Sequence, residues 1–150
     1  MAQPAGRVLV VGGGRAGPLS VWDAETETWY PISSMPHHPR GRFITLNRDF
    51  AARPDVVGDI NRSPFASRTF IRVYFEKVEW ASFTGRNLGA IDESARLLRD
   101  GGRLIIETGS GVRPQLPSIT QRMSETGFRY VRVSGMKYGG IRITGRRRDS

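Results

Sequence analysis

The sequence predicts an α/β domain with a mostly parallel sheet and an antiparallel hairpin near its C-terminal end. Short apolar segments rich in β-branched residues recur along the chain, as expected of buried strands. One of them, at residues 104–106, follows directly after a helical pattern, which is the arrangement of a βαβ unit. Residues 128–133 and 141–144 instead alternate between apolar and polar or basic side chains, which is typical of strands with one buried face.

The helical pattern comes immediately before residues 104–106. Its apolar residues are spaced three or four apart and therefore lie on one helical face: Leu88, Ile91, Ala95 and Leu98. We expect residues 100–102, Asp-Gly-Gly, to end this helix, because glycine adopts the left-handed C-cap conformation at no steric cost. The strand Leu-Ile-Ile follows at residues 104–106.

Composition limits the classes of function. The chain has 150 residues, enough for one core, and carries a net charge of +9 from 23 Lys and Arg against 14 Asp and Glu. This charge favours a nucleic acid or another polyanion as partner, although a solvated basic surface would give the same count. The absence of cysteine excludes disulfides, thiolate nucleophiles and cysteine-ligated zinc. No apolar run is long enough for a signal peptide or membrane span, so a cytoplasmic location without membrane contact is expected.

The first strand, at residues 7–11, leads into the glycine turn Gly12, Gly13 and Gly14. Such a turn lets backbone N–H groups approach a ligand closely, as in nucleotide sites that follow a first strand. A tight turn without a ligand is the alternative interpretation.

A β-rich insert is predicted at about residues 18–41. Residues 19–23 and 28–32 are rich in β-branched and aromatic side chains and predict a β-hairpin. Residues 8–35 also resemble one kelch repeat, but a single repeat cannot bury the faces of a propeller blade, so we interpret the likeness as a local ribbon. His37 and His38 follow in a proline-rich loop, where solvated histidines are favoured over a metal or acid/base site.

Three further strands are predicted at residues 42–46, within 53–60 and at 70–76. Each ends in polar residues: Asn47 and Asp49, then Asp59, then Glu76. The carboxyl ends of parallel strands meet at one edge of a sheet, where open α/β folds bind their ligands. We therefore expect these side chains to gather there.

Five segments together resemble the class I S-adenosylmethionine-dependent methyltransferases: residues 44–49, 54–60, 63–65, 73–76 and 97–105. The resemblance covers residues 7–14 and about 43 to the end, and it implies a single Rossmann-like three-layer domain over residues 1–150. It implies S-adenosylmethionine as cofactor. The family commonly has an acid where this chain has Asn47.

The resemblance also implies roles for individual residues. Gly12, Gly13 and Gly14 would form the turn against the methionine part of the cofactor, and Asn47 or Asp49 would hold the ribose hydroxyls. Asp59 and Ile60 would contact the adenine.

On the side of the methyl acceptor, the resemblance implies catalytic roles for Tyr74 and Glu76. Glu76 would orient the acceptor or take its proton. A strand-end acid paired with a nearby arginine is the alternative reading of Glu76.

The C-terminal part is predicted to hold a loop at residues 110–117 and then a helix capped by Ser118 and ended by Gly127. An antiparallel strand pair follows, with Arg129, Arg132 and Arg142 on its polar faces. These arginines would either contact a phosphate backbone or discourage strand pairing at the sheet edge.

The leading hypothesis is a methyltransferase-like enzyme acting on nucleic acid or another polyanion. The second is a methyltransferase-shaped domain without transfer activity, acting as a binding module or as a bacterial toxin effector with an immunity or partner protein. The third is a β-rich interaction protein, which only the kelch-like stretch supports.

Overall fold

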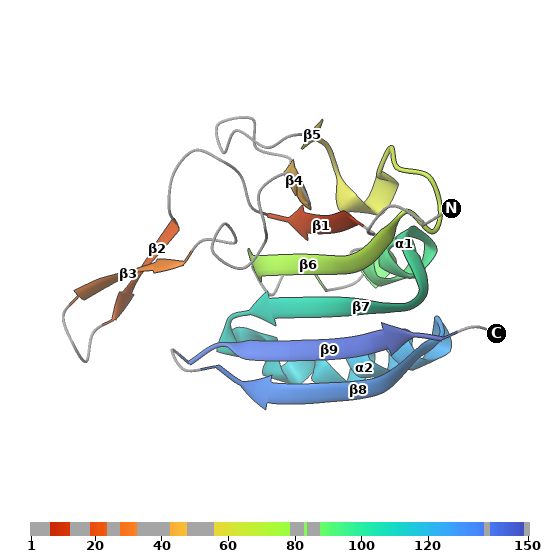
Figure 1. The fold of residues 1–150 in the computed structure, drawn as a ribbon. Coiled ribbons are helices and arrows are strands. Elements are labelled where there is room, and N and C mark those ends of the chain that lie inside the picture. Colours follow the sequence, from red (N-terminus) through yellow and green to blue (C-terminus); the bar gives the residue numbers. More distant parts are fainter. Residues whose placement is uncertain are drawn as a thin grey trace.

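The computed structural model describes residues 7–12, 19–23, 28–32, 43–47, 56–78, 83, 88–136 and 139–148. The central element is a seven-stranded sheet in the order β5-β4-β1-β6-β7-β9-β8 (Figure 1). Its strands are β1 (Arg7–Val11), β4 (Phe43–Asn47), β5 (Val56–Val57), β6 (Phe70–Val78), β7 (Leu98–Thr108), β8 (Phe128–Gly135) and β9 (Ile141–Arg147).

The sheet is mostly parallel. β5, β4, β1, β6 and β7 run in one direction, and β9 is antiparallel to both of its neighbours, β7 and β8. The predicted α/β class, with its antiparallel C-terminal hairpin, is therefore confirmed. Strand order reverses around β1, whose neighbours are β4 and β6, so the carboxyl ends of these strands flank the crevice that open α/β folds use for ligands.

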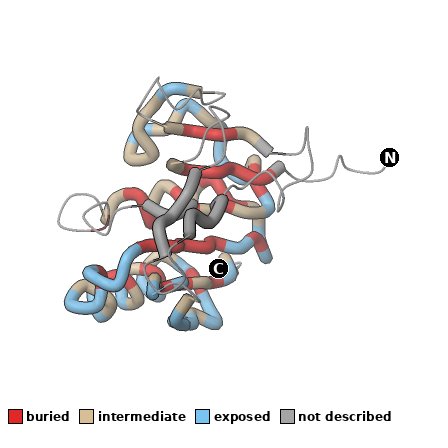
Figure 2. Tube along the Cα trace, turned by 90° about the vertical axis from the view of Figure 1, so that its left-hand side faces the viewer, coloured by how far each residue is buried: buried red, intermediate tan, exposed pale blue. Residues whose placement is uncertain are grey.

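Two α-helices, α1 (Gly89–Leu97) and α2 (Leu116–Glu125), pack against one face of the sheet, behind it in Figure 1. The main core lies between them and the strands, and the buried residues trace the central strands in Figure 2. Leu9, Leu104 and Ile106 reach it from the sheet, and Ile91 and Met123 reach it from the helices. The other face carries a small buried cluster of Val8 and Val10, with Tyr74 packed against it.

Two predicted boundaries are wrong. α1 ends at Leu97 and β7 begins at Leu98, so residues 100–102 lie inside the strand rather than at the helix end. Gly101 does adopt a positive φ, of 77°, but it lies where the pairing of β7 with β6 shifts register and not at a helix end. Likewise α2 begins at Leu116 without a side-chain cap, after the 3₁₀ helix η5 (Ser110–Gln115), so Ser118 is not its cap.

The predicted hairpin is confirmed. β2 (Leu19–Asp23) and β3 (Thr28–Ile32) form a separate two-stranded antiparallel sheet in which Trp22 is opposite Trp29. β1 belongs to the large sheet instead, so residues 8–35 do not form one kelch blade, in agreement with the interpretation as a local ribbon.

A β-bulge interrupts the pairing of β8 with β9. Arg129 is opposite Arg146 and Arg132 is opposite Thr144, so three steps on β8 match two steps on β9. Tyr130 absorbs the extra residue with a positive φ of 54°, which is rare for a residue with a Cβ. Arg129 and Arg132 thereby lie on the same face of the sheet, which a regular strand would not allow for residues three apart.

We expect Tyr130→Gly to stabilise the protein. Glycine relieves the left-handed strain, and little packing is lost because Tyr130 is 74 % exposed, so the free energy of unfolding should rise by about 1 kcal/mol. Urea unfolding followed by circular dichroism measures it. Val133→Gly, at a 43 % exposed position in the same strand, should instead destabilise. A loss of stability in Tyr130→Gly as large as in Val133→Gly would contradict the assigned strain.

Candidate functional site

Three strand ends are joined at the carboxyl edge of the sheet. The backbone N–H of Gly12 donates to the carbonyl oxygen of Leu46 at 2.9 Å, and the Asn47 side-chain amide donates to the carbonyl oxygen of Gly12 at 3.0 Å. The N–H of Gly58 in turn donates to the Asn47 carbonyl oxygen at 3.0 Å. Gly12 has a φ of 89°, which glycine adopts without steric strain. Because glycine has no Cβ, the backbone here is open to a ligand. The structure therefore brings together Gly12, Asn47 and the segment that follows β5.

Asp59 lies one residue beyond Gly58 and caps the 3₁₀ helix η2 (Ile60–Arg62). Its Oδ1 accepts from the backbone N–H of Asn61 at 2.9 Å and from the Asn61 side-chain amide at 3.0 Å. These bonds fix the direction of the carboxylate. The neighbouring Ile60 is half-buried and packs against the main core, so it offers an apolar surface next to the acid.

The loop after η2 is fastened to α1 by an ion pair. Glu93 accepts from the hydroxyl of Ser63 at 2.6 Å and from its N–H at 3.1 Å, and Arg96 donates to both Glu93 oxygens at 2.6 and 2.8 Å. Arg96 also donates to the Phe65 carbonyl oxygen at 2.8 Å. Because this loop begins directly after η2, the Glu93–Arg96 ion pair on α1 also restrains η2 and the Asp59 that caps it.

We expect the stability of the protein to depend on the charge of Glu93. The hydrogen bonds from Arg96, supported by Ser63, lower the pKa of Glu93 below its ordinary 4.5, against the opposing effect of burial. A lowered folded-state pKa contributes stability that is present above the unfolded value and is lost as pH falls through the folded value. Unfolding free energies measured between pH 7 and about pH 3 should therefore fall on the acid side.

Glu93→Gln removes this pH dependence. It should lower the free energy of unfolding at neutral pH by about 1.5–3 kcal/mol, the range for hydrogen bonds to a charged group. Glu125→Gln, an exposed carboxylate on α2, is the control and should change little. Equal acid sensitivity of Glu93→Gln and the unchanged protein would contradict the assignment.

A second polar group lies on the sheet face opposite the helices. The Tyr74 hydroxyl donates to Oε1 of Glu107, and the Arg142 guanidinium donates to Oε2 from Nε at 3.1 Å and from Nη2 at 2.6 Å. Glu107 is 2 % exposed, whereas Arg142 is 49 % exposed. Its hydrogen bonds to Glu107 raise the pKa of Arg142. This group joins β6, β7 and β9 just below their rim.

Tyr74 was predicted as a site residue, but Glu107 and Arg142 were not predicted as its partners. Tyr74 is level with Val10, two residues short of Gly12, so it lies on the face of the sheet rather than at its rim. One signal in the sequence pointed to Glu107: an acid directly after three apolar residues at the end of a buried strand. Such an acid needs a partner when buried.

Several predicted residues lie outside this description. Gly13, Gly14, Asp49 and the histidines His37 and His38 are not among the described residues, and Glu76 lies in β6 without a described side chain. Their roles stay predictions. Among the described residues, no three metal-ligating side chains cluster, and no helix is long and apolar enough to cross a membrane.

No protein-family model and no curated protein matches the chain by sequence. Solved structures do match it. A chain of the complex between the Haloferax volcanii Trm112 methyltransferase activator and a candidate methyltransferase superposes with a TM-score of 0.67 and 12 % identity, over 99 % of this chain and 85 % of that one. The antibiotic-resistance methyltransferase Kmr gives 0.64 and 15 %, over 97 % and 88 %.

The chain has the class I methyltransferase fold. A third neighbour, the T. thermophilus 16S rRNA N2 G1207 methyltransferase in complex with AdoMet and guanosine, has a TM-score of 0.59 and 14 % identity, over 100 % of this chain and 37 % of that one. In this fold, Gly12 follows β1, Asn47 ends β4 and Gly58 follows β5. The resemblance assigns cofactor contacts to Gly12, to Asn47 and to Asp59, the residue after Gly58.

Proposed function

We propose that the protein is an S-adenosylmethionine-dependent methyltransferase that acts on nucleic acid or another polyanion, and that the carboxyl edge of β1, β4 and β5 binds the cofactor. The observation that carries the proposal is the linkage of three strand ends around a glycine of positive φ, with an oriented carboxylate beside it. A cytoplasmic site of action is part of the same proposal.

The described residues fit the cofactor. Gly12 allows backbone to approach the methionine part, and the carboxylate of Asp59 can accept from an exocyclic amine, with Ile60 against the adenine plane. Asn47 would serve the ribose through its amide, which also holds Gly12. The cofactor supplies a methyl group on a positively charged sulfur, so the residues of the chain need only hold the acceptor in line and exclude water.

Tyr74 and Glu76 are the proposed residues on the acceptor side. Glu107 fixes the direction in which the Tyr74 hydroxyl donates, and a phenol that donates to a carboxylate becomes a stronger hydrogen-bond acceptor itself. Its oxygen can then hold the N–H or O–H of an acceptor. Glu76 lies two residues further along β6, level with Gly12, and would orient the acceptor or take its proton.

The proposal is tested by thermal unfolding with and without S-adenosylmethionine or its demethylated product. At a ligand concentration about 100 times the dissociation constant, a binder gains about 2.7 kcal/mol, which corresponds to about 5–10 °C for a chain of this size. ATP at the same concentration, which shares the adenosine but lacks the methionine part, should give little shift. Equal shifts with ATP, or none with either methionine-containing ligand, would contradict the cofactor site.

The alternative is a methyltransferase-shaped binding module, including a toxin effector, that has lost transfer. One observation favours the binding module: the Tyr74 hydroxyl already donates its proton to a buried carboxylate and does not offer that proton to a methyl acceptor. Transfer of a radiolabelled methyl group to bulk RNA, DNA or protein separates the two. Cofactor binding without any labelled product would favour the binding module.

A further inference from the structure

Four arginines lie opposite one another across four adjacent strands. In the sheet register, Arg72 of β6 is opposite Arg103 of β7, Arg103 is opposite Arg146 of β9, and Arg146 is opposite Arg129 of β8. Directly opposite residues share a face of a sheet. The four, called here the arginine row, therefore lie on the face away from α1 and α2, and at about 4.8 Å per strand they span about 14 Å.

The row is at the surface, and the acids among the described residues do not pair with it. Arg103, Arg129 and Arg146 are exposed and Arg72 is half-buried. Within the part of the chain that the structure describes, no carboxylate forms an ion pair with any of the four, and Arg146 donates only to the carbonyl oxygen of Gly101 at 2.9 Å. Like charges directly opposite one another in a sheet are destabilising, so the arrangement has a cost without an anion.

Protection of a sheet edge does not explain the row. Of the four strands that carry it, β6, β7 and β9 are interior strands, and only β8, with Arg129 and Arg132, is an edge strand. The bulge at Tyr130 is needed to place Arg129 on this face, and it holds a tyrosine in a strained conformation. Strain of this kind is found where a side chain must be presented.

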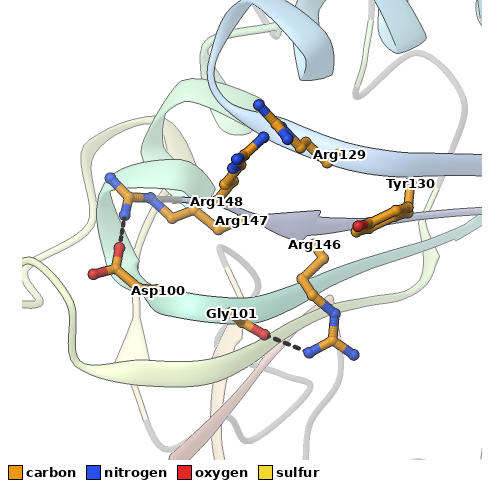
Figure 3. Close-up of a pocket in the computed structure, with 7 residues that line it drawn as sticks. All are labelled: Asp100, Gly101, Arg129, Tyr130, Arg146, Arg147 and Arg148. Atoms are coloured by element: carbon orange, nitrogen blue, oxygen red, sulfur yellow. Dashed lines mark hydrogen bonds and ion pairs between the residues drawn. The ribbon is translucent and has the colours of Figure 1, made fainter. Parts of the chain in front are cut away.

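The row ends in a pocket of about 290 Å³, shown in Figure 3. It is lined by Asp100, Gly101, Arg129, Tyr130, Arg146, Arg147 and Arg148. Arg147 donates to Asp100 at 2.8 Å, which leaves the other three arginines and the exposed Tyr130 ring around the opening. Arginine forks match phosphate oxygens, and an exposed aromatic ring is a stacking platform for a base.

We propose that the arginine row and Tyr130 form a binding surface for single-stranded nucleic acid. The phosphates lie along the row, across β6, β7, β9 and β8, and a base stacks on Tyr130. The row is four residues before the level of Gly12 on neighbouring strands, about 13 Å, so a strand bound along it runs across the sheet at that distance from the carboxyl edge. The inference rests on the arginine register and not on the proposed cofactor, so the two can fail separately.

Fluorescence anisotropy with a labelled single-stranded oligonucleotide of mixed sequence, about 12 nucleotides long, as RNA and as DNA, tests the surface. Arg103→Gln/Arg146→Gln should weaken binding at least tenfold and lower the slope of log affinity against log salt by about 1.4, because each phosphate contact in a single strand contributes about 0.7. Tyr130→Ala should weaken binding about tenfold.

The matched control is Arg62→Gln/Arg113→Gln, which removes the same charge from exposed arginines off the row. It should bind nearly as the unchanged protein does. Equal weakening by both pairs would overturn the proposal in favour of unspecific attraction. Tighter binding of a duplex of the same sequence, or equal competition by polyglutamate, would overturn it in favour of duplex or of an acidic protein partner.

Binding of S-adenosylmethionine separates this proposal from the proposed function. Row variants that lose the oligonucleotide but keep the thermal shift with S-adenosylmethionine support both. Oligonucleotide binding that depends on the row, in a protein without any cofactor shift, supports the surface and contradicts the enzyme. Absence of oligonucleotide binding at low salt overturns the surface, whatever the cofactor does.

Discussion

Arg142→Met is expected to lower the free energy of unfolding by about 3–5 kcal/mol, the range measured when one partner of a buried ion pair is removed. The reason is the unequal burial of the pair. Glu107 is 2 % exposed and its carboxylate would lose the charged partner that offsets its burial, whereas the Met side chain fills much of the space of Arg142. Tyr74 alone cannot balance a buried carboxylate.

The unequal burial of the two partners also predicts that removing the charge of Glu107 destabilises the protein less than removing Arg142. Glu107→Gln leaves Arg142 unpaired, but that side chain is 49 % exposed and can be solvated, so about 1–2 kcal/mol is expected. The double variant should be closer to Glu107→Gln than to the sum of both, which a double-mutant cycle in urea measures. Arg132→Met, exposed on β8, is the control. Equal losses in Arg142→Met and Arg132→Met would show that Glu107 does not depend on the pair.

Gly12→Val is expected to remove the stabilisation by S-adenosylmethionine, about 2.7 kcal/mol at 100 times the dissociation constant. At a φ of 89° a β-branched side chain is strained, and its methyl groups would occupy the space through which the backbone approaches the ligand. Because the variant also destabilises the free protein, the quantity to compare is the rise in Tm on adding ligand, not the Tm itself.

Gly101→Val is the matched control for this test. Gly101 has a similar φ of 77°, a Cβ there would meet nothing within 4 Å, and it lies at the opposite edge of the sheet. Both variants therefore carry comparable backbone strain, and only Gly12→Val should lose the response to ligand. A full ligand response in Gly12→Val would place the cofactor elsewhere.

Local patterns were sufficient for most elements of the fold. The parallel strands of the large sheet contain short apolar runs, and β8 and β9 alternate between apolar and polar residues. The ribbon at Leu19–Asp23 and Thr28–Ile32 has the bounds that its β-branched and aromatic residues predict. The start of α2 was missed because Ser118 offered a plausible cap, while Pro117, which is favoured in the first turn, already indicated an earlier start.

The contacts of the site were less predictable, because they depend on register between distant segments. Glu107 and Arg142 are 35 residues apart and meet only because Glu107 is opposite Arg142 in the β7–β9 pairing. The arginine row has the same origin, and its last member depends on the bulge at Tyr130. Hydrophobic periodicity reports which face a residue occupies, but not which residue lies beside it.

The Asn47 amide restricts which side chains position 47 can accept. An aspartate at this position would turn an acceptor toward the carbonyl oxygen of Gly12 where a donor now lies 3.0 Å away. Two oxygens with no proton between them repel. The Asn47 amide and the conformation of Gly12 therefore depend on each other, so an acid at position 47 would disturb the backbone at Gly12.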